Sequence, residues 1–133
     1  MSYALEMCEK AKHCSMLSEM DTAVEHSYSP MPFPLSKPYI CFGTEYVSED
    51  FLIGDDSICI KENMLVRIDV SDESNGEYCR ECARIVCTAL TELDSQKRIV
   101  SISADKCCHD QKLGTYFINI KFGLREVRRS NNY

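Results

Sequence analysis

One predicted helix constrains the fold of this 133-residue chain more than any other feature, and it covers residues 75–94. Ser74 and Glu77 have the spacing of a capping box, in which each side chain bonds to the other residue's backbone amide. Apolar residues then recur at intervals of three and four and form one stripe: Cys79, Cys82, Ala83, Val86, Ala89, Leu90 and Leu93. Because such a stripe has to be buried, the segments around the helix are expected to supply a sheet.

Three stretches around this helix alternate apolar and polar residues, as strands with one buried face do. They are residues 64–70 before the helix and residues 98–104 and 115–122 after it. Every second residue of the first stretch is apolar, from Met64 to Val70. The order strand, helix, strand, strand is similar to half of a ferredoxin-like or ACT-like unit.

Residues 39–70 as a whole are predicted to form a meander of antiparallel strands, because polar turn sequences interrupt the apolar runs. The turns are expected at residues 48–50, 54–56 and 62–63. A first amphipathic helix is predicted over residues 3–20, which contain no Gly or Pro. The prediction is therefore an α+β fold in the order α-β-β-β-α-β-β. A mainly antiparallel sheet of five to six strands would carry two amphipathic helices on one face.

We expect a single domain over residues 1–133, because a chain of this length can bury a workable core. The helix at 3–20 would be followed by an extended Pro-rich connector at 21–38 and by the α+β core at 39–123. The four prolines fix the backbone of the connector in extended conformations. Residues 124–133 lack a second apolar face and are expected to fray.

Composition and charge narrow the classes of function. The formal net charge is -6 and the sequence pI is about 5.0, so the overall field repels phosphate backbones and anionic membranes. No apolar run reaches the roughly 18 residues of a spanning helix, and the first 20 residues lack the apolar core of a signal peptide. We expect a protein that binds neither nucleic acid nor membranes and that is intracellular, in the cytoplasm or nucleus.

The nine cysteines are expected to be reduced, because their number is odd and no Asn-x-Ser/Thr sequence is present. Cys79 and Cys82 have the spacing of two zinc ligands, and Cys107, Cys108 and His109 are the donors available to complete a site. Cys79 and Cys82 also lie on the apolar stripe, where reduced cysteine behaves as a small hydrophobic residue. We favour burial in the core, keep a zinc-binding protein as an alternative and predict no cofactor.

No catalytic arrangement stands out. The three histidines, His13, His26 and His109, fall in separate predicted elements, and no nucleophile motif accompanies any of them. The five glycines give neither a GxGxxG nor a P-loop spacing. The sequence leaves the question of an enzyme open and favours the answer no.

The first functional hypothesis is a non-enzymatic protein–protein interaction module, an adaptor or regulatory subunit. Met31, Phe33 and Leu35 are the candidate partner-binding residues, because they place apolar side chains on an extended segment. The alternative is that this segment packs on the domain as a strap. A homodimer formed through the strand Tyr116–Phe122 is a lesser version, since a terminal strand can be a sheet edge.

The second hypothesis is a small-molecule-sensing regulatory domain. The similarity in element order to an ACT-like unit would permit a ligand near the turn Ser71–Gly76. This hypothesis depends on element order alone, and element order does not determine function.

Overall fold

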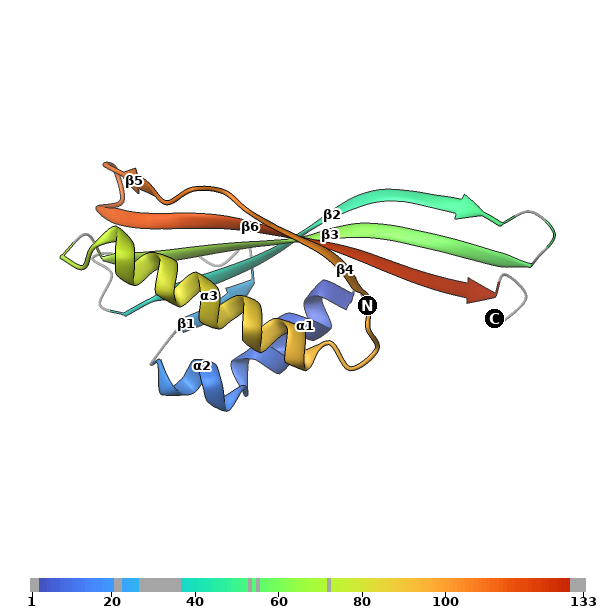
Figure 1. Cartoon of the computed structure of the whole chain (residues 1–133), viewed down its shortest axis with the longest axis horizontal. Coiled ribbons are helices and arrows are strands. Elements are labelled where there is room, and N and C mark those ends of the chain that lie inside the picture. The colour runs from blue at the N-terminus through green and yellow to red at the C-terminus, as the bar shows by residue number, and fades with distance from the viewer. Residues whose placement is uncertain are drawn as a thin grey trace.

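The computed structural model describes residues 3–20, 23–26, 37–52, 54, 56–71 and 73–129. The elements follow one another as α1 (Tyr3–Lys12), α2 (Ser15–Glu19), β1 (Ala23–His26), β2 (Tyr39–Phe51), β3 (Ser57–Ser71), α3 (Gly76–Leu93), β4 (Ile99–Ala104), β5 (Cys108–Asp110) and β6 (Thr115–Arg129). Six strands form one sheet in the order β1-β2-β3-β6-β4, and β5 pairs with β6. The helices lie on one face of this sheet (Figure 1).

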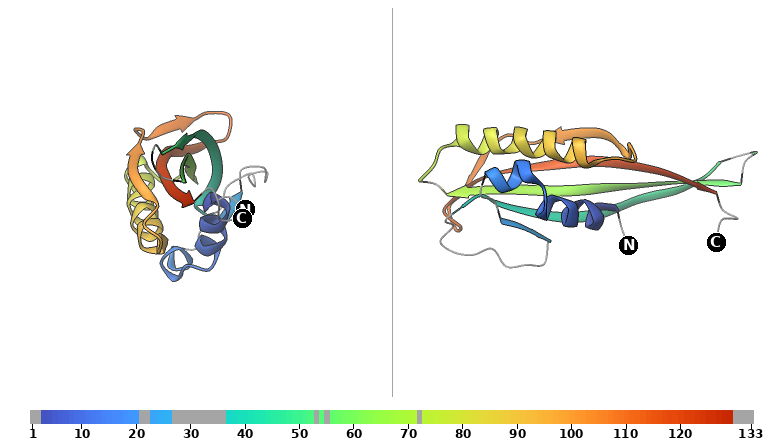
Figure 2. Two further views of the ribbon diagram at one scale, coloured as in Figure 1. Left: turned by 90° about the vertical axis from the view of Figure 1, so that its right-hand side faces the viewer. Right: turned by 90° about the horizontal axis from the view of Figure 1, so that it is seen from below.

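The fold is α+β with a mostly antiparallel sheet, as the sequence predicts. β1 pairs in parallel with β2, and the other neighbouring strands are antiparallel. β3 and β4, which α3 connects, lie on either side of β6. Seen from below, α3 lies beside α1 and α2 on the same side of the sheet (Figure 2).

The predicted helix over residues 3–20 is two helices, so the described residues form three helices where the sequence predicts two. α1 ends at Lys12, and Cys14 has an extended backbone with φ -77° and ψ 124°. The chain then turns into α2, which packs against α3 and buries Leu17. The break contains no Gly or Pro, so tertiary packing rather than local sequence accounts for it.

The predicted meander over residues 39–70 is a pair of long strands, and two of its expected turns are wrong. Residues 48–50 continue β2 after a register shift between Tyr46 and Ser48, and residues 62–63 lie inside β3. These polar residues pair across the strands: Asn63 donates to Glu45 at 2.9 Å, for example. Polar residues here mark exposed strands rather than turns.

Two short strands occur where the sequence predicts irregular chain. β1 lies within the predicted connector at 21–38, and β5 lies between the last two predicted strands. Met31, Phe33 and Leu35 lie outside the described residues. Neither short strand has enough residues to show a recognisable alternation on its own.

The tail prediction is also wrong for the residues that the structure describes. β6 continues to Arg129 and pairs with β3 from Ser57 onward. Leu124, the first residue of the predicted tail, is only 3% exposed. Backbone pairing holds this segment, so a second apolar face is not required.

The core lies between the helices and the inner face of the sheet. Every second residue of β3 and β6 faces it, as the alternation predicts. The residues that these two strands contribute to the core are Met64, Val66, Ile68, Val70, Ile118, Ile120, Phe122 and Leu124. α3 contributes its predicted stripe, and Cys79 and Cys82 are fully buried within it. Its N-cap is Asn75 rather than Ser74, because the Asn75 side chain accepts from the Tyr78 amide at 3.0 Å.

A buried carboxylate joins the two ends of the helical layer. Asp94, at the C-cap of α3, accepts a hydrogen bond of 2.6 Å from the Tyr3 hydroxyl at the start of α1. It also accepts from the backbone amides of Arg98 and Ile99 at 3.0 and 2.9 Å. Burial alone would raise the pKa of Asp94, but these hydrogen bonds outweigh it and lower the pKa. These contacts therefore favour the ionised carboxylate.

Beyond the helices, β2, β3 and β6 continue as a three-stranded arm, at the right of Figure 1. We define the arm as residues 46–51, 57–62 and 125–129, which pair with one another. Large apolar side chains are exposed on it: Tyr46 is 67% exposed and Phe51 76%. The arm is thus a sheet without a helical layer on its described surface.

Replacing Leu90, which is fully buried in α3, should lower the free energy of unfolding. We expect Leu90→Ala to cost about 2–5 kcal/mol, from lost burial and the cavity left behind. Urea denaturation followed by circular dichroism would measure this. Val100→Ala, at a residue 62% exposed, should change stability by less than about 0.5 kcal/mol. Equal losses in the two variants would contradict the assignment of the core.

Asp94→Asn should destabilise the protein in a pH-dependent way. Folding lowers the pKa of Asp94 below its ordinary value of 3.8, so its carboxylate stabilises the fold above that pH. The contribution is lost as the pH falls through the lower folded-state pKa. We expect a loss of about 1.5–3 kcal/mol at pH 7, because the hydrogen bonds are made to a charged group. Urea melts should show the difference shrinking toward pH 2, whereas Glu92→Gln, at an exposed residue of the same helix, should have little effect. A constant difference across pH would refute the argument.

Candidate functional site

The outer edge of β4 is an accessible backbone edge of the sheet. Within the described residues, β4 pairs with β6 on one side, and no strand pairs with its other side. Five of its six residues are exposed, including Val100 at 62% and Ile102 at 44%. Such an edge is a template for another strand.

The register shows which backbone groups of β4 face outward. The amide of Asp105 donates to the carbonyl oxygen of Asn119 in β6 at 2.9 Å. In an antiparallel ladder, successive residues point their backbone groups alternately toward and away from the partner strand. Ser103 therefore points its N–H and C=O toward β6, while Ile102 and Ala104 point theirs to the outer edge. The side chains of Ile102 and Ala104 lie on the helical side of the sheet, opposite Phe122 and Ile120.

A groove runs between this edge and α3, and we call it the edge groove. Its volume is about 490 Å³. The lining is mainly apolar and combines residues of α3 with the end of β4 and one residue of β6: Arg80, Ala83, Arg84, Cys87, Thr88, Ala104, Asp105 and Ile118. The edge groove thus places small apolar side chains directly beside the outward-facing backbone of Ala104.

Two arginines of α3 give the edge groove a basic rim. Arg80 donates to Glu77 at 2.7 Å, and this hydrogen bond lowers the pKa of Glu77. Arg84 is 4.0 Å from Glu81, and the side chains of that pair are 71% and 65% exposed. Exposed ion pairs of this kind contribute little and exchange readily with other carboxylates. Arg80 and Arg84 can therefore exchange these partners for carboxylates of a bound segment, while Asp105 keeps one acidic group in the lining.

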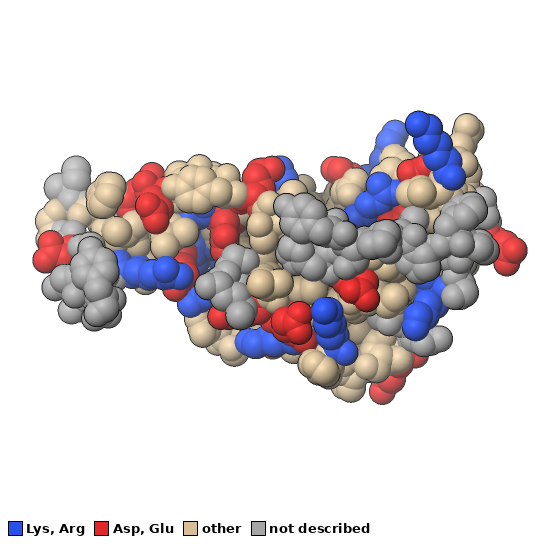
Figure 3. Space-filling view, turned by 180° about the vertical axis from the view of Figure 1, so that it is seen from behind, with Lys and Arg blue, Asp and Glu red and all other residues tan. Residues whose placement is uncertain are grey.

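Elsewhere the surface charge is mixed. On the face seen in Figure 3, Lys and Arg side chains are interspersed with Asp and Glu. A nucleic-acid interface would require basic residues to gather on one side. The face in view therefore gives no support to nucleic-acid binding, in agreement with the net charge of -6.

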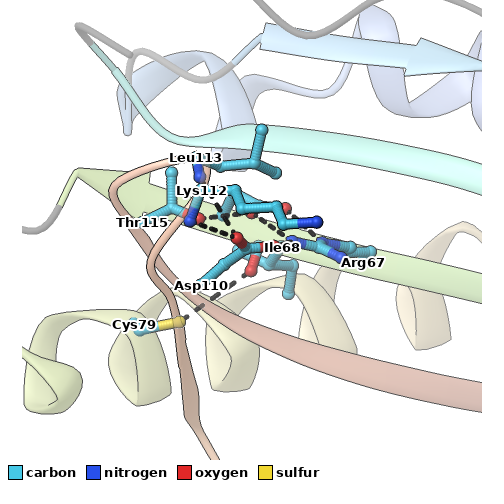
Figure 4. A network of polar contacts seen from close by, with 8 residues as sticks. Arg67, Ile68, Cys79, Asp110, Lys112, Leu113 and Thr115 are labelled. Carbon is cyan, nitrogen blue, oxygen red and sulfur yellow. Dashed lines mark hydrogen bonds and ion pairs between the residues drawn. The ribbon is translucent and has the colours of Figure 1, made fainter. Parts of the chain in front are cut away.

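The opposite side of the sheet carries a buried ion pair that anchors the hairpin of β5 and β6 (Figure 4). Asp69 of β3 is 2% exposed and accepts two hydrogen bonds from Arg67, at 2.8 and 2.9 Å. The Thr115 hydroxyl also donates to Asp69, at 2.8 Å, and Arg67 reaches Asp110 at 3.3 Å. The Arg67 guanidinium lies 4.0 Å from the centre of the Phe117 ring.

This network has a structural role. The side chains of Asp69 and Asp110 both pair with Arg67, so each carboxylate has a partner within the cluster. Asp110 in turn accepts from the amides of Lys112 and Leu113 at 3.0 and 3.1 Å. The network therefore closes the β5–β6 turn onto β3.

A hollow of about 450 Å³ lies next to this network on the same side of the sheet. Its lining mixes polar and apolar residues of four strands and includes Cys41, Leu65, Asn119, Lys121 and Ser103. Burial, more than the nearby charge of Asp69, raises the pKa of the Cys41 thiol. A thiol with a raised pKa is a poor nucleophile at neutral pH. The hollow gives no sign of covalent catalysis.

The predicted zinc donors are only partly brought together. Cys79 forms a hydrogen bond with Cys107, whereas His109 of β5 packs on Tyr116 with the ring centres 4.9 Å apart. Cys108 donates weakly to the carbonyl oxygen of Lys106, at 3.6 Å. Among the residues that the structure describes, no group of three or more His, Cys, Asp or Glu side chains is arranged to hold a metal ion.

The turn proposed for a small ligand has a cavity beside it. This cavity of about 270 Å³ is lined by Lys37, Pro38, Val70, Ser71, Ser74 and Tyr78. Small-molecule pockets usually measure roughly 300–1,000 Å³. The cavity is therefore slightly smaller than a typical ligand site.

The strand predicted to form a homodimer edge is not an edge. Tyr116–Phe122 belongs to β6, which pairs with β3 on one side and with β4 and β5 on the other. Its backbone groups are already used within the sheet. The prediction failed because the chain returns β6 to the middle of the sheet, so that β4, earlier in sequence, becomes the outer strand.

Comparison with known proteins gives no further assignment. No protein-family model matches the chain, and no curated protein matches its sequence. Within the described segments, no helix has the length and apolar character needed to cross a membrane.

Sequence reasoning missed the edge groove. The exposed Ile102 was assigned to a strand and the helix residue Ala83 to an apolar stripe, and both assignments imply burial. The available signal is the width of the stripe: Cys87 and Thr88 extend the helix surface beyond the core-facing residues. This signal shows that a second helix face exists but not what lies beside it.

Thr115→Val should test the buried network. Thr115 is fully buried and donates to the charged Asp69, so removing its hydroxyl should lower the free energy of unfolding by about 1.5–3 kcal/mol. Thr115→Ser keeps the donor and should lose only about 1 kcal/mol, for the missing methyl group. Urea unfolding measures both. A serine variant less stable than the valine variant would show that packing outweighs the hydrogen bond.

Proposed function

We propose that this protein is a non-enzymatic interaction module that captures an extended segment of another protein by strand addition at β4. One observation supports this most: the outward-facing backbone of β4 ends at Ala104, which lines the edge groove. Strand addition needs both features, because the backbone hydrogen bonds supply affinity and side-chain pockets supply specificity.

The edge groove fits alternate side chains of such a segment. An added strand would pair with β4 and place every second side chain on the helical side of the sheet. These side chains would contact Ala83 and Cys87 of α3 and Ile118 of β6. The small residues of this lining leave room for medium-sized apolar side chains such as Val or Ile.

The basic rim defines the second requirement of the partner. Arg80 and Arg84 border the edge groove, and their acidic neighbours Glu77 and Glu81 are exposed. A partner carboxylate can therefore replace an existing weak ion pair. The partner is an extended segment in which apolar and acidic residues alternate.

Partner binding by the connector at residues 21–38 remains a separate proposal. Met31, Phe33 and Leu35 lie outside the described residues, so their role as partner-binding residues rests on the sequence alone. The same holds for a homodimer, which would have to use an edge other than Tyr116–Phe122.

The small-molecule-sensing domain is a second candidate function, favoured by the cavity beside Ser71 and Ser74. The cavity offers Lys37, two serine hydroxyls and the Tyr78 ring to a small polar ligand. Its volume of about 270 Å³ makes this the weaker candidate.

The test is a selection from a random peptide library displayed on phage, with the full chain immobilised. We expect the selected peptides to alternate apolar and acidic residues and to bind with measurable affinity in fluorescence anisotropy. Ile102→Pro should weaken binding about tenfold or more, because it removes an outward-facing N–H and one hydrogen bond. That N–H makes no bond within the sheet, so proline is tolerated at this edge position.

Ile102→Thr is the matched control, because it keeps the backbone N–H and removes only apolar surface. It should weaken binding less than Ile102→Pro does. Arg84→Gln should weaken binding of acidic peptides selectively. The proposal fails if no peptide is enriched, or if the selected peptides bind Ile102→Pro as tightly as the unmodified chain while both melt at the same temperature.

A further inference from the structure

Two cysteines far apart in sequence meet at the first turn of α3. Cys79 is fully buried on the inner face of the helix and also points toward the carbonyl oxygen of Ile68, at 3.9 Å. Cys107, in the connection between β4 and β5, is half-buried and shares a hydrogen bond with Cys79. The Cys107 sulfur also covers Gly76, lying 3.6 Å from the place where a Cβ of that residue would be.

We propose that Cys79 and Cys107 form an intramolecular disulfide when the protein meets a low-molecular-weight disulfide such as oxidised glutathione. Two observations support this assignment: the two thiols are in contact, and solvent reaches Cys107 but not the fully buried Cys79. It does not depend on strand capture at β4. It adds a modification site that joins α3 to the β4–β5 connection.

The reaction balances as two thiol–disulfide exchanges. The Cys107 thiolate attacks one sulfur of oxidised glutathione, forms a mixed disulfide and releases the first glutathione thiolate. Cys79 then gives up its proton and attacks the Cys107 sulfur, which releases the second glutathione. The two protein thiols lose two electrons and two protons in total, and oxidised glutathione is reduced to two molecules of glutathione.

The environment sets the order of these steps. Cys107 is the more accessible of the two, because it is half-buried whereas Cys79 is fully buried. Burial first, and then the charge and hydrogen bond of Cys107, raise the pKa of Cys79 to about 12. The contribution of Cys107 disappears once its sulfur is in a mixed disulfide. Cys79 therefore acts second, in a step between groups already in contact.

The test uses the full chain and oxidised glutathione. After the reaction, free thiols are blocked with N-ethylmaleimide at acidic pH, and tryptic peptides are analysed by mass spectrometry without reduction. Trypsin cleaves after Arg67, Arg80, Lys106 and Lys112, so Cys79 is separated from Cys82. We expect a cross-link between peptides 68–80 and 107–112, lighter than their sum by two hydrogen atoms.

Two serine variants show whether Cys107 or Cys108 of peptide 107–112 forms the cross-link. The cross-link should be lost in Cys107→Ser and kept in Cys108→Ser, with circular dichroism showing that both variants are folded. In urea, where the contact is absent, the cross-link should give way to a mixture of pairs. Three results would overturn the proposal: an unmodified chain, glutathione retained on Cys107 without a cross-link, or a cross-link that requires Cys108.

Discussion

The structure depends on how much of its two longest strands the helices can cover. β3 and β6 have 15 residues each, which span about 50 Å when extended. α3 has 18 residues and is only about 27 Å long. The helical layer therefore covers one part of the sheet and ends, and Asp94 fixes the point at which it ends by binding Tyr3 and the chain entering β4. The arm is the remainder of the same strands.

This mismatch explains which elements could be predicted from the sequence. α3 could be predicted because a cap and an apolar stripe are local signals. The covered half of β3 could be predicted because Met64, Val66 and Ile68 alternate with polar residues. Parts of the arm were interpreted as turns (residues 48–50 and 62) and as a frayed tail (residues 125–129), because these segments are rich in polar residues and lack the alternation that burial imposes. Backbone pairing, which leaves little trace in composition, holds it together.

The candidate site was less predictable for a different reason. A sheet edge is a property of strand order, and strand order is decided by long-range pairing that no local pattern records. The sequence suggests β6 as an edge because it is the last strand, but β6 inserts between β3 and β4. Ile102, which was expected in the core, therefore lies exposed on the outer strand of the sheet. The predicted cysteine cluster was partly right, since Cys79 does meet Cys107 across 28 residues of sequence, but Cys108 and His109 face other neighbours.

The two proposed sites share one corner of the fold. Arg80 borders the edge groove, and it also lies beside Gly76, whose other neighbour is the Cys107 sulfur. Asp105 lines the same groove and stands two residues before Cys107 in the connection that leaves β4. A disulfide between Cys79 and Cys107 would fix that connection to the helix and restrict how far the end of β4 can move from α3. Because a strand that docks on β4 has to fit the width of this gap, oxidation would favour the partners that the reduced groove already fits and exclude larger ones.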